Sequence, residues 1–283
     1  MAKSQSPKSN RTDVTVETKK SVATINYERD AGGGMEGTDA QSFAIPFLGI
    51  LQKGSPQIED GNAKFVKGAR AGMFFNTVTQ CLYEGKDTGV ILVPVAYQRR
   101  FIRWSPRDIG GGYRGEFKPE EVSLMRADKR VVDMDGYLFF PAEDGSVHEK
   151  KSDRLADTRN HYCLLIDPKT GTYDTVLFSL ASTQVKKSKH LMSMLSSIKF
   201  TRSDKTPYTP PTYANKVRAT TVLESNDQGS WYGVKFEIIG AVQETALYVS
   251  AKEFHNNVIK GIAHAAPYEP TTAGATQESA STF

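Results

Sequence analysis

The feature of this chain that most constrains its fold is a series of segments rich in β-branched and aromatic residues, arranged in pairs around short turns. The clearest pair covers residues 161–166 and 173–180 and flanks the sequence Asp-Pro-Lys-Thr-Gly. A second pair covers residues 217–224 and 231–239 and flanks Ser-Asn-Asp-Gln-Gly. Strand-like runs joined by short connections that contain glycine are typical of antiparallel hairpins. The sequence therefore predicts a mainly β fold.

Two Asp-Gly pairs predict two more hairpins. Asp135-Gly136 separates residues 129–134 from residues 137–140, and Asp144-Gly145 lies within residues 142–147. Aspartate and glycine tolerate the positive backbone φ angles that a two-residue hairpin turn requires.

The region before residue 100 predicts further strands. Residues 74–83 read as a strand, and Glu84-Gly85-Lys86 reads as a hairpin turn into the next strand, which begins at residue 90. Pro94 lacks an N–H group, so it predicts an edge position or a bulge in that next strand. Residues 42–52 are apolar and predict a short helix or strand that docks on the core.

Two helical segments interrupt the strands. Residues 182–198 place apolar side chains near one face at helical spacing, and residues 250–264 begin with Ser250 and Glu253 at capping-box spacing. We therefore expect a mainly β fold with two or three helices.

Composition sets the domain boundaries. Residues 44–265 have the apolar content of a single β-rich domain, whereas residues 1–43 and 266–283 hold few large apolar groups. Such segments bury too little surface to offset their conformational entropy, so we expect a flexible N-terminal arm and a flexible C-terminal tail. Phe283 ends the tail and is a candidate contact for a partner protein.

Charge and cysteine content narrow the class of protein. The 283 residues carry a net charge of only +4, so an anionic partner must be met by a local patch. Cys81 and Cys163 lie in separate apolar segments, which favours free thiols in a reducing cytoplasm. No segment has the length of a membrane span or the pattern of a signal peptide. We expect a cytoplasmic protein with no membrane contact.

The motifs of several enzyme classes are missing. The sequence contains no phosphate-binding loop, no nucleophile elbow and no metal-binding histidine spacing. The acidic pairs Asp133/Asp135 and Asp153/Asp157 are explained by a turn and by a charged surface segment. We predict that the protein is not an enzyme and needs no metal or cofactor.

Residues 89–118 pass from an apolar strand into a segment where aromatic residues alternate with arginines. If residues 97–104 continue the strand, the two-residue period divides their side chains between two faces. One face would carry Tyr97, Arg99, Phe101 and Arg103, and the other Arg100, Ile102 and Trp104. Only Asp108 and Glu116 oppose the six cations of this stretch.

A glycine triplet at residues 110–112 follows, flanked by Arg107 and Arg114, and predicts a mobile tip. A second basic cluster lies on the helical segment 182–198 and just after it, where two tyrosines follow. Aromatic rings offer surfaces on which unpaired bases stack, and guanidinium groups neutralise phosphates. The same residues also fit a plainer interpretation, in which the rings are core and the cations are a solvated rim.

We therefore predict a non-catalytic, sequence-tolerant protein that binds single-stranded DNA. The candidate binding residues are Tyr97, Arg99, Arg100, Phe101, Arg103, Trp104, Arg107, Tyr113, Arg114, Lys186, Lys187, Lys189 and Arg202. This hypothesis requires the two basic clusters to share one surface.

Three sequence stretches carry a resemblance to a known group. IPFLGILQKGSPQ, KGARAGMFFNTVT and GVILVPVAYQRRFIRW, with the glycine triplet, resemble tailed-bacteriophage early proteins regarded as single-stranded DNA-binding proteins. The resemblance implies an OB-fold-like antiparallel barrel that coats single strands during phage DNA replication and recombination in the host cytoplasm. It also implies that the tail recruits replication proteins, although here the tail holds only two acids, Glu269 and Glu278.

Two alternatives have the same composition. One is a phage structural or assembly protein whose aromatic residues anchor it to other proteins and which has no nucleic-acid role. The other is a recombination enzyme or strand-annealing protein.

Overall fold

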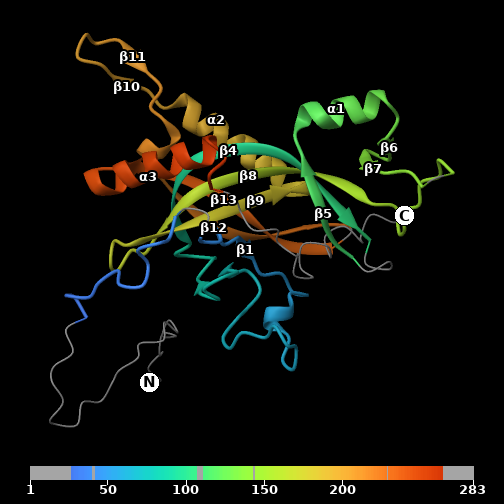
Figure 1. Cartoon of the computed structure of the whole chain (residues 1–283), viewed down its shortest axis with the longest axis horizontal. Coiled ribbons are helices and arrows are strands. Elements are labelled where there is room, and N and C mark those ends of the chain that lie inside the picture. The colour runs from blue at the N-terminus through green and yellow to red at the C-terminus, as the bar shows by residue number, and fades with distance from the viewer. Residues whose placement is uncertain (1–26, 40–41, 107–110, 143, 228, 264–283) are drawn as a thin grey trace.

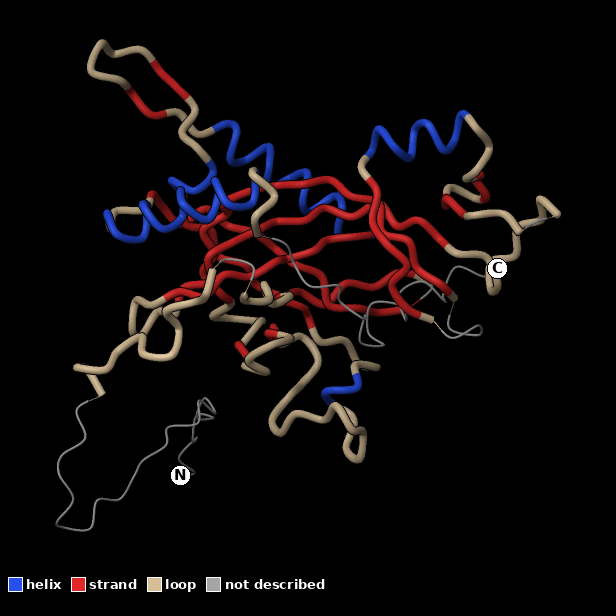
Figure 2. Tube along the Cα trace, viewed as in Figure 1, coloured by secondary structure: helices blue, strands red, loops and turns tan. Residues whose placement is uncertain are grey.

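The fold is mainly β and contains three α-helices in the part of the chain that the structure describes (Figures 1 and 2). The structure is a computed structural model, and it describes residues 27–39, 42–106, 111–142, 144–227 and 229–263. The predicted fold class is confirmed. None of the described helices is long and apolar enough to cross a membrane.

An eight-stranded sheet organises the molecule. Its strand order is β13-β12-β4-β8-β7-β6, with β5 paired to β4 and β9 paired to β8, and all of these pairings are antiparallel. The strands curl into a half-barrel, consistent with the OB-like core (Figure 2). The bounds are β4 Val90–Ser105, β5 Gly112–Phe117, β6 Val132–Met134, β7 Tyr137–Phe139, β8 Arg154–Ile166, β9 Tyr173–Ala181, β12 Asn215–Asn226 and β13 Gly229–Ala241.

The two clearest predicted hairpins are confirmed as β8–β9 and β12–β13, and both are longer than the patterns indicated. The Asp135-Gly136 turn is also confirmed between β6 and β7, and both of its residues have positive φ. Asp144-Gly145 also forms a turn, in which the Ala142 N–H donates to the Ser146 carbonyl. This turn lies in the connection between β7 and β8, which pair antiparallel, but residues 142–147 contain no strand, so the tight hairpin predicted for this segment is not formed.

Strand β4 contains the bulge that Pro94 predicted. Its register against β8 shifts between Pro94 and Ala96, because proline cannot donate to the ladder. The bulge lies in a central strand, since β4 pairs with β8 and β12. The half of β4 after the bulge pairs with the first half of β8, and it carries the candidate site.

Three clusters of buried side chains hold the elements together. The largest fills the interior of the half-barrel, where strand side chains meet Leu191 and Leu195 of α2 (Val185–Ser197). A second lies under α3 (Thr245–Ile259), and a third lies under α1 (Pro119–Ala127). The predicted helix at residues 182–198 is confirmed as α2, preceded by the 3-10 helix η3 (Ser182–Gln184).

The start predicted for the last helix is wrong. Helix α3 begins at Thr245, five residues before Ser250, so Ser250 lies inside the helix and not at its cap. Its hydroxyl accepts a hydrogen bond from the Tyr173 hydroxyl, with 2.6 Å between the oxygens. Helix α1 was not predicted at all.

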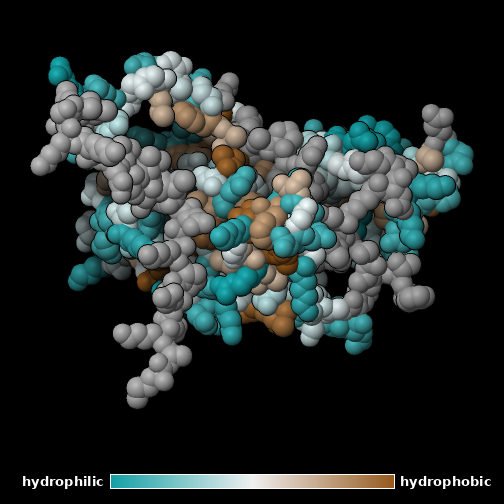
Figure 3. Space-filling view, turned by 90° about the horizontal axis from the view of Figure 1, so that it is seen from below, coloured by the Kyte–Doolittle hydropathy of each residue, from teal (hydrophilic) through white to brown (hydrophobic). Residues whose placement is uncertain are grey.

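Two small sheets complete the fold. β1 (Leu48–Ile50), β2 (Phe74–Asn76) and β3 (Leu82–Tyr83) form one of them, so residues 74–83 are a hairpin in themselves and not one strand. This corrects the prediction of a hairpin from that segment into β4. The face that carries this sheet shows hydrophobic residues near its centre, with hydrophilic residues around them (Figure 3).

The second small sheet pairs β10 (Phe200–Thr201) with β11 (Pro207–Tyr208). These strands form a hairpin that projects from the body beyond the end of α2 (Figure 1). We call residues 199–209 the basic arm. Two more 3-10 helices, η1 (Pro56–Ile58) and η4 (Thr212–Ala214), lie in the connections.

Candidate nucleic-acid interface

The alternation predicted along the second half of β4 is present. Arg99 and Arg103 point to the same face of the sheet, where they meet carboxylates of β8 and the segment before it. Arg100 points to the opposite face and pairs with Glu116 of β5 at 3.5 Å. Because β4 stays extended here, neighbouring residues alternate between two surfaces.

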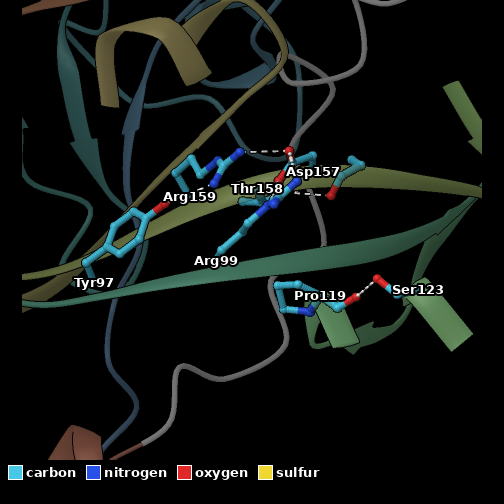
Figure 4. Close-up of polar contacts among 8 residues, drawn as sticks. Tyr97, Arg99, Pro119, Ser123, Asp157, Thr158 and Arg159 are labelled. Carbon is cyan, nitrogen blue, oxygen red and sulfur yellow. Dashed lines mark hydrogen bonds and ion pairs between the residues drawn. The ribbon is translucent and has the colours of Figure 1, made fainter. Parts of the chain in front are cut away.

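The first polar network joins β4 to β8 (Figure 4). Arg99 binds Asp157 through two nitrogens, Nε and Nη2, at 3.0 and 2.9 Å. Arg159 donates to the same carboxylate at 2.8 Å and to the Tyr97 hydroxyl at 3.0 Å. One aspartate is therefore shared by two arginines. The hydrogen bond to Asp157 also raises the pKa of Arg99, so this guanidinium stays charged.

The second network lies further along the same face. Arg103 Nε binds Asp153 at 2.6 Å, and Ser105 donates to the other oxygen of that carboxylate at 2.7 Å. Arg114 of β5 donates its Nε proton to the Ser105 hydroxyl at 2.7 Å. We call the four arginines on this face, Arg99, Arg103, Arg114 and Arg159, the arginine row.

The sequence underestimated how many acids face these cations. It pointed to Asp108 and Glu116, but the arginine row meets Asp157 of β8 and Asp153 of the segment just before β8. Asp108 lies outside the described residues. The antiparallel register opposes Phe101 to Asp157 and so brings this acid beside Arg99, a contact separated by 58 residues in sequence.

A buried histidine connects helix α2 to the row. His161 Nε2 is 2.8 Å from the Ser188 hydroxyl of α2, and the His161 ring packs against the Tyr97 ring at a centroid distance of 5.3 Å. Burial, followed by the nearby Arg159 charge, lowers the pKa of His161 to about 4. The ring is therefore neutral at pH 7, and it connects the row to the helix that carries the second basic cluster.

Two residues predicted to bind nucleic acid have other surroundings. Phe101 is only 8% exposed and packs under α1 with Val122 and Leu155, so its ring is part of the core and is not an open stacking surface. Arg103, predicted to neutralise a phosphate, stacks over the Phe140 ring at 3.9 Å. The strand pattern could not reveal these contacts, because α1 and Phe140 come from later in the chain.

The reverse face carries the remaining rings. Trp104 and Tyr113 pack edge to face, with centroids 5.9 Å apart, and both are half-buried. Burial is the main cause that raises the pKa of Tyr113. Trp104 and Arg103 are adjacent in sequence but lie on opposite faces of β4, so the predicted residues form two surfaces and not one groove.

The lysines of α2 differ in their surroundings. Lys186 and Lys189 are exposed and form no ion pair with a described residue, whereas Lys187 pairs with Glu224 at 2.5 Å. Arg202 lies on the basic arm, where it stacks over Tyr208 at 4.7 Å. The helix from Ser188 to Ser197 spans about 14 Å. This length separates Arg202 from the arginine row.

Some predicted site residues lie outside the described part of the chain. These are Arg107 and Phe283. Most of the predicted N-terminal arm and the predicted C-terminal tail also lie outside the described residues. The described residues contain no group of three or more His, Cys, Asp or Glu side chains placed to hold a metal ion.

Comparison with known proteins places this chain in a phage family. Residues 16–264 match the family described as "Pam3 phage gp34-like protein". The chain belongs to this family. It is therefore a bacteriophage protein, as the resemblance implied, but the family description does not mention DNA. No curated protein and no solved structure matches the chain.

The most informative residue that sequence reasoning missed in this gp34-like protein is Arg159. It is 7% exposed, and its Nε has no hydrogen-bond partner. A signal was present, because Asp153, Asp157, Arg159 and His161 all have odd numbers and so share one face of a strand with Leu155. That series of ionisable residues at alternate positions would have indicated a polar network on one face.

Proposed function

We propose that this protein binds single-stranded DNA without catalysis, through the arginine row and the neighbouring lysines of α2. The observation that carries the proposal is an excess of positive charge on one face of the sheet. Four arginines there face two aspartates, and α2, which packs on the same face through Ser188, adds exposed Lys186 and Lys189. Neutralisation of phosphates by such a surface is the main source of sequence-independent affinity.

The ion pairs of the row leave donors for phosphate. An arginine has five N–H donors in a planar fork, and Arg99 uses only its Nε and Nη2 groups on Asp157. Its side chain is 41% exposed, and exposed pairs of this kind contribute little to stability. Arg114 is exposed, and among the described residues it donates a hydrogen bond to one hydroxyl, that of Ser105, through Nε. These two residues are the best placed to meet a phosphate.

Stacking would come mainly from the outer end of the site. Trp104 and Tyr113 lie on the reverse face, so a strand must pass around the outer edge of β5 to meet both these rings and the row. Each stacked base contributes on the order of 1–3 kcal/mol in proteins of this kind. Phe101 has no such role, because it is buried.

Its place in phage replication and recombination, its contact with replication proteins through the tail around Phe283, and its location in the host cytoplasm belong to the same proposal. They rest on the resemblance of the sequence to phage early proteins.

A binding titration tests the proposal. Fluorescence anisotropy of labelled oligo-dT and of the matching duplex, measured at several salt concentrations, should show tighter binding of the single strand and an affinity that falls steeply with salt. Trp104→Ala should weaken binding about 10- to 100-fold at every salt concentration. Arg114→Ala should lower the slope of log K against log salt by about 0.7.

Lys252→Ala serves as the control, because Lys252 is exposed on α3, away from the row. It should bind like the unmodified protein. Equal affinity for duplex and single strand, or unchanged binding by both site variants, contradicts the proposal.

A phage structural or assembly protein is the second candidate, and one observation favours it. Arg99, Arg100 and Arg103 all have carboxylate partners within the chain, as structural arginines do. If this candidate is right, the oligonucleotide titration gives no binding, and the protein co-purifies with virion components from infected cells.

A further inference from the structure

The two segments that connect the strands at opposite ends of the molecule carry opposite charge. The connection between β9 and β12, residues 182–214, has six basic residues and one acid. The connection between β5 and β8, residues 118–153, has nine acids and six basic residues. Figure 1 shows the basic arm at one end of the long axis and the unit of α1, β6 and β7 at the other.

The basic arm is a defined structure and not a loose loop. Its strands are only two residues long, which alone gives a marginal hairpin. Phe200 and Tyr208 pack edge to face at 6.0 Å, and Arg202 covers the Tyr208 ring. Its acid, Asp204, is engaged in the turn, where Thr206 donates to it through both its N–H and its hydroxyl. Lys199, Arg202 and Lys205 are left exposed around the ring pair.

The opposite end offers a complementary surface. On the outer face of α1, Leu124 is 63% exposed and follows Glu120 by one helical turn. The arginines of this unit are used internally, since Arg126 pairs with Asp133 and Arg130 with Asp128. The exposed carboxylates that form no ion pair with a described residue include Glu120, Asp135 and Glu149.

We propose that the basic arm of one molecule docks on the acidic α1–β6–β7 end of a second copy of this chain. The arm cations would face Glu120 and its acidic neighbours, and the Phe200–Tyr208 pair would cover Leu124. Complementary charge of this kind steers association and fixes the register of partners. A second copy of the chain would contact both charged ends, whereas a nucleic-acid strand would contact only the basic one.

The contact is head-to-tail, so it repeats. An arm and its acceptor on different surfaces make a heterologous interface, which produces rings or open arrays. The basic arm and α1 lie on the same side of the sheet (Figure 1). Copies related by translation along the long axis would therefore present their arginine rows in one line. The association itself does not depend on the proposed function.

Sedimentation velocity of the full-length chain tests the proposal with charge-swapped variants. The wild-type protein should associate with rising concentration in about 0.1 M salt and dissociate in about 1 M salt, where the Debye length falls from about 10 to about 3 Å. The arm variant Lys199→Glu/Arg202→Glu/Lys205→Glu and the acidic-end variant Glu120→Lys/Asp135→Asn/Glu149→Lys should each lose association by roughly a hundredfold. An equimolar mixture of the two should associate again.

Lys64→Glu/Lys67→Glu/Lys86→Glu gives the same change in net charge as the arm variant, at exposed positions in the connections around the β1–β3 sheet, and should associate like wild type. A monomeric wild type in low salt, or a mixture that fails to associate, overturns the proposal. A monomeric wild type whose arm variant loses oligo-dT affinity also overturns it and assigns the arm to nucleic acid. Because association is measured without DNA, its outcome is separate from that of the proposed function.

Discussion

At the scale of single residues, the site depends on one shared anion, Asp157. Asp157→Asn removes the negative charge that both Arg99 and Arg159 contact. The buried Arg159 then loses a charged partner, so the free energy of unfolding should fall by about 2 kcal/mol. Binding of oligo-dT should become tighter, because the row gains net positive charge. Chemical denaturation and anisotropy measure the two effects.

Asp174→Asn is the matched control, since Asp174 is exposed on β9 and away from the row. It should change neither property. If Asp157→Asn weakens oligo-dT binding while the protein stays folded, Asp157 orients the arginines for the ligand and does not compete with it.

His161 predicts a pH dependence of stability. Its pKa in the folded protein is about 4, below the ordinary value of 6.5, so between these values the unfolded chain binds more protons than the folded one. The contribution of His161 to the free energy of unfolding is therefore fully present above about pH 6.5 and is lost as the pH falls toward 4. The total loss is on the order of 3 kcal/mol. Urea denaturation across this range should show a flatter profile for His161→Gln than for the control His190→Gln. Equal slopes for the two variants would contradict this assignment.

The sequence correctly predicted which face of β4 each side chain occupies, but it did not predict the residues that these side chains contact. The two-residue period of a strand is local, so the side of β4 to which Arg99 and Arg100 point could be predicted. The pairing of Arg99 with Asp157, and the burial of Phe101 under α1, depend on register and on packing between distant segments. No local pattern contains that information.

At the scale of elements, α1 shows that an aromatic residue in a basic strand can be core. Phe101→Ala should lower the free energy of unfolding by about 3 kcal/mol, because it leaves a cavity among Val122 and Leu155. Thermal or chemical denaturation measures this loss. Leu124→Ala, on the exposed face of the same helix, should change stability by less than about 0.5 kcal/mol. A fully stable Phe101→Ala protein would show that α1 does not depend on this ring.

Helix α2 is held to the sheet edge by a glutamine. Gln184 accepts a hydrogen bond from the buried Val234 N–H of β13 at 3.0 Å, in place of a neighbouring strand. Gln184→Ala leaves this N–H unpaired and should cost about 1–3 kcal/mol of stability. Gln243→Ala, at an exposed position, is the control and should have little effect. Equal stabilities would mean that water satisfies Val234.

The elements that the sequence predicted well are those with strong local signals, namely the long hairpins and α2. Helix α1 had signals that were overlooked, because Pro119 stands at its first turn and Glu120 and Glu121 follow. The start of α3 was misplaced because Ser250 and Glu253 have capping-box spacing, whereas the Ser250 hydroxyl accepts a hydrogen bond from Tyr173. Local capping patterns do not exclude a tertiary partner.

At the scale of the whole molecule, the question that the sequence left open was whether the two basic clusters share a surface. The first cluster is divided by β4 into two faces, and α2 packs on the face that holds the arginine row. The contact between His161 and Ser188, which are 27 positions apart in sequence, connects α2 to this face. The first half of α2, which carries Lys186 and Lys189, therefore begins near the row, while Arg202 lies on the basic arm.

Photo-crosslinking of a bromodeoxyuridine-substituted single strand to the wild-type protein, with the crosslinked peptides identified by mass spectrometry, tests whether DNA binds at the arginine row. Crosslinks are expected in β4 from residue 97 onward, in β5 and in the first half of α2, with fewer at high salt because the row holds the strand through phosphates. Crosslinks confined to other regions, or none with a strand that the protein retains on native gels, would contradict binding at the row.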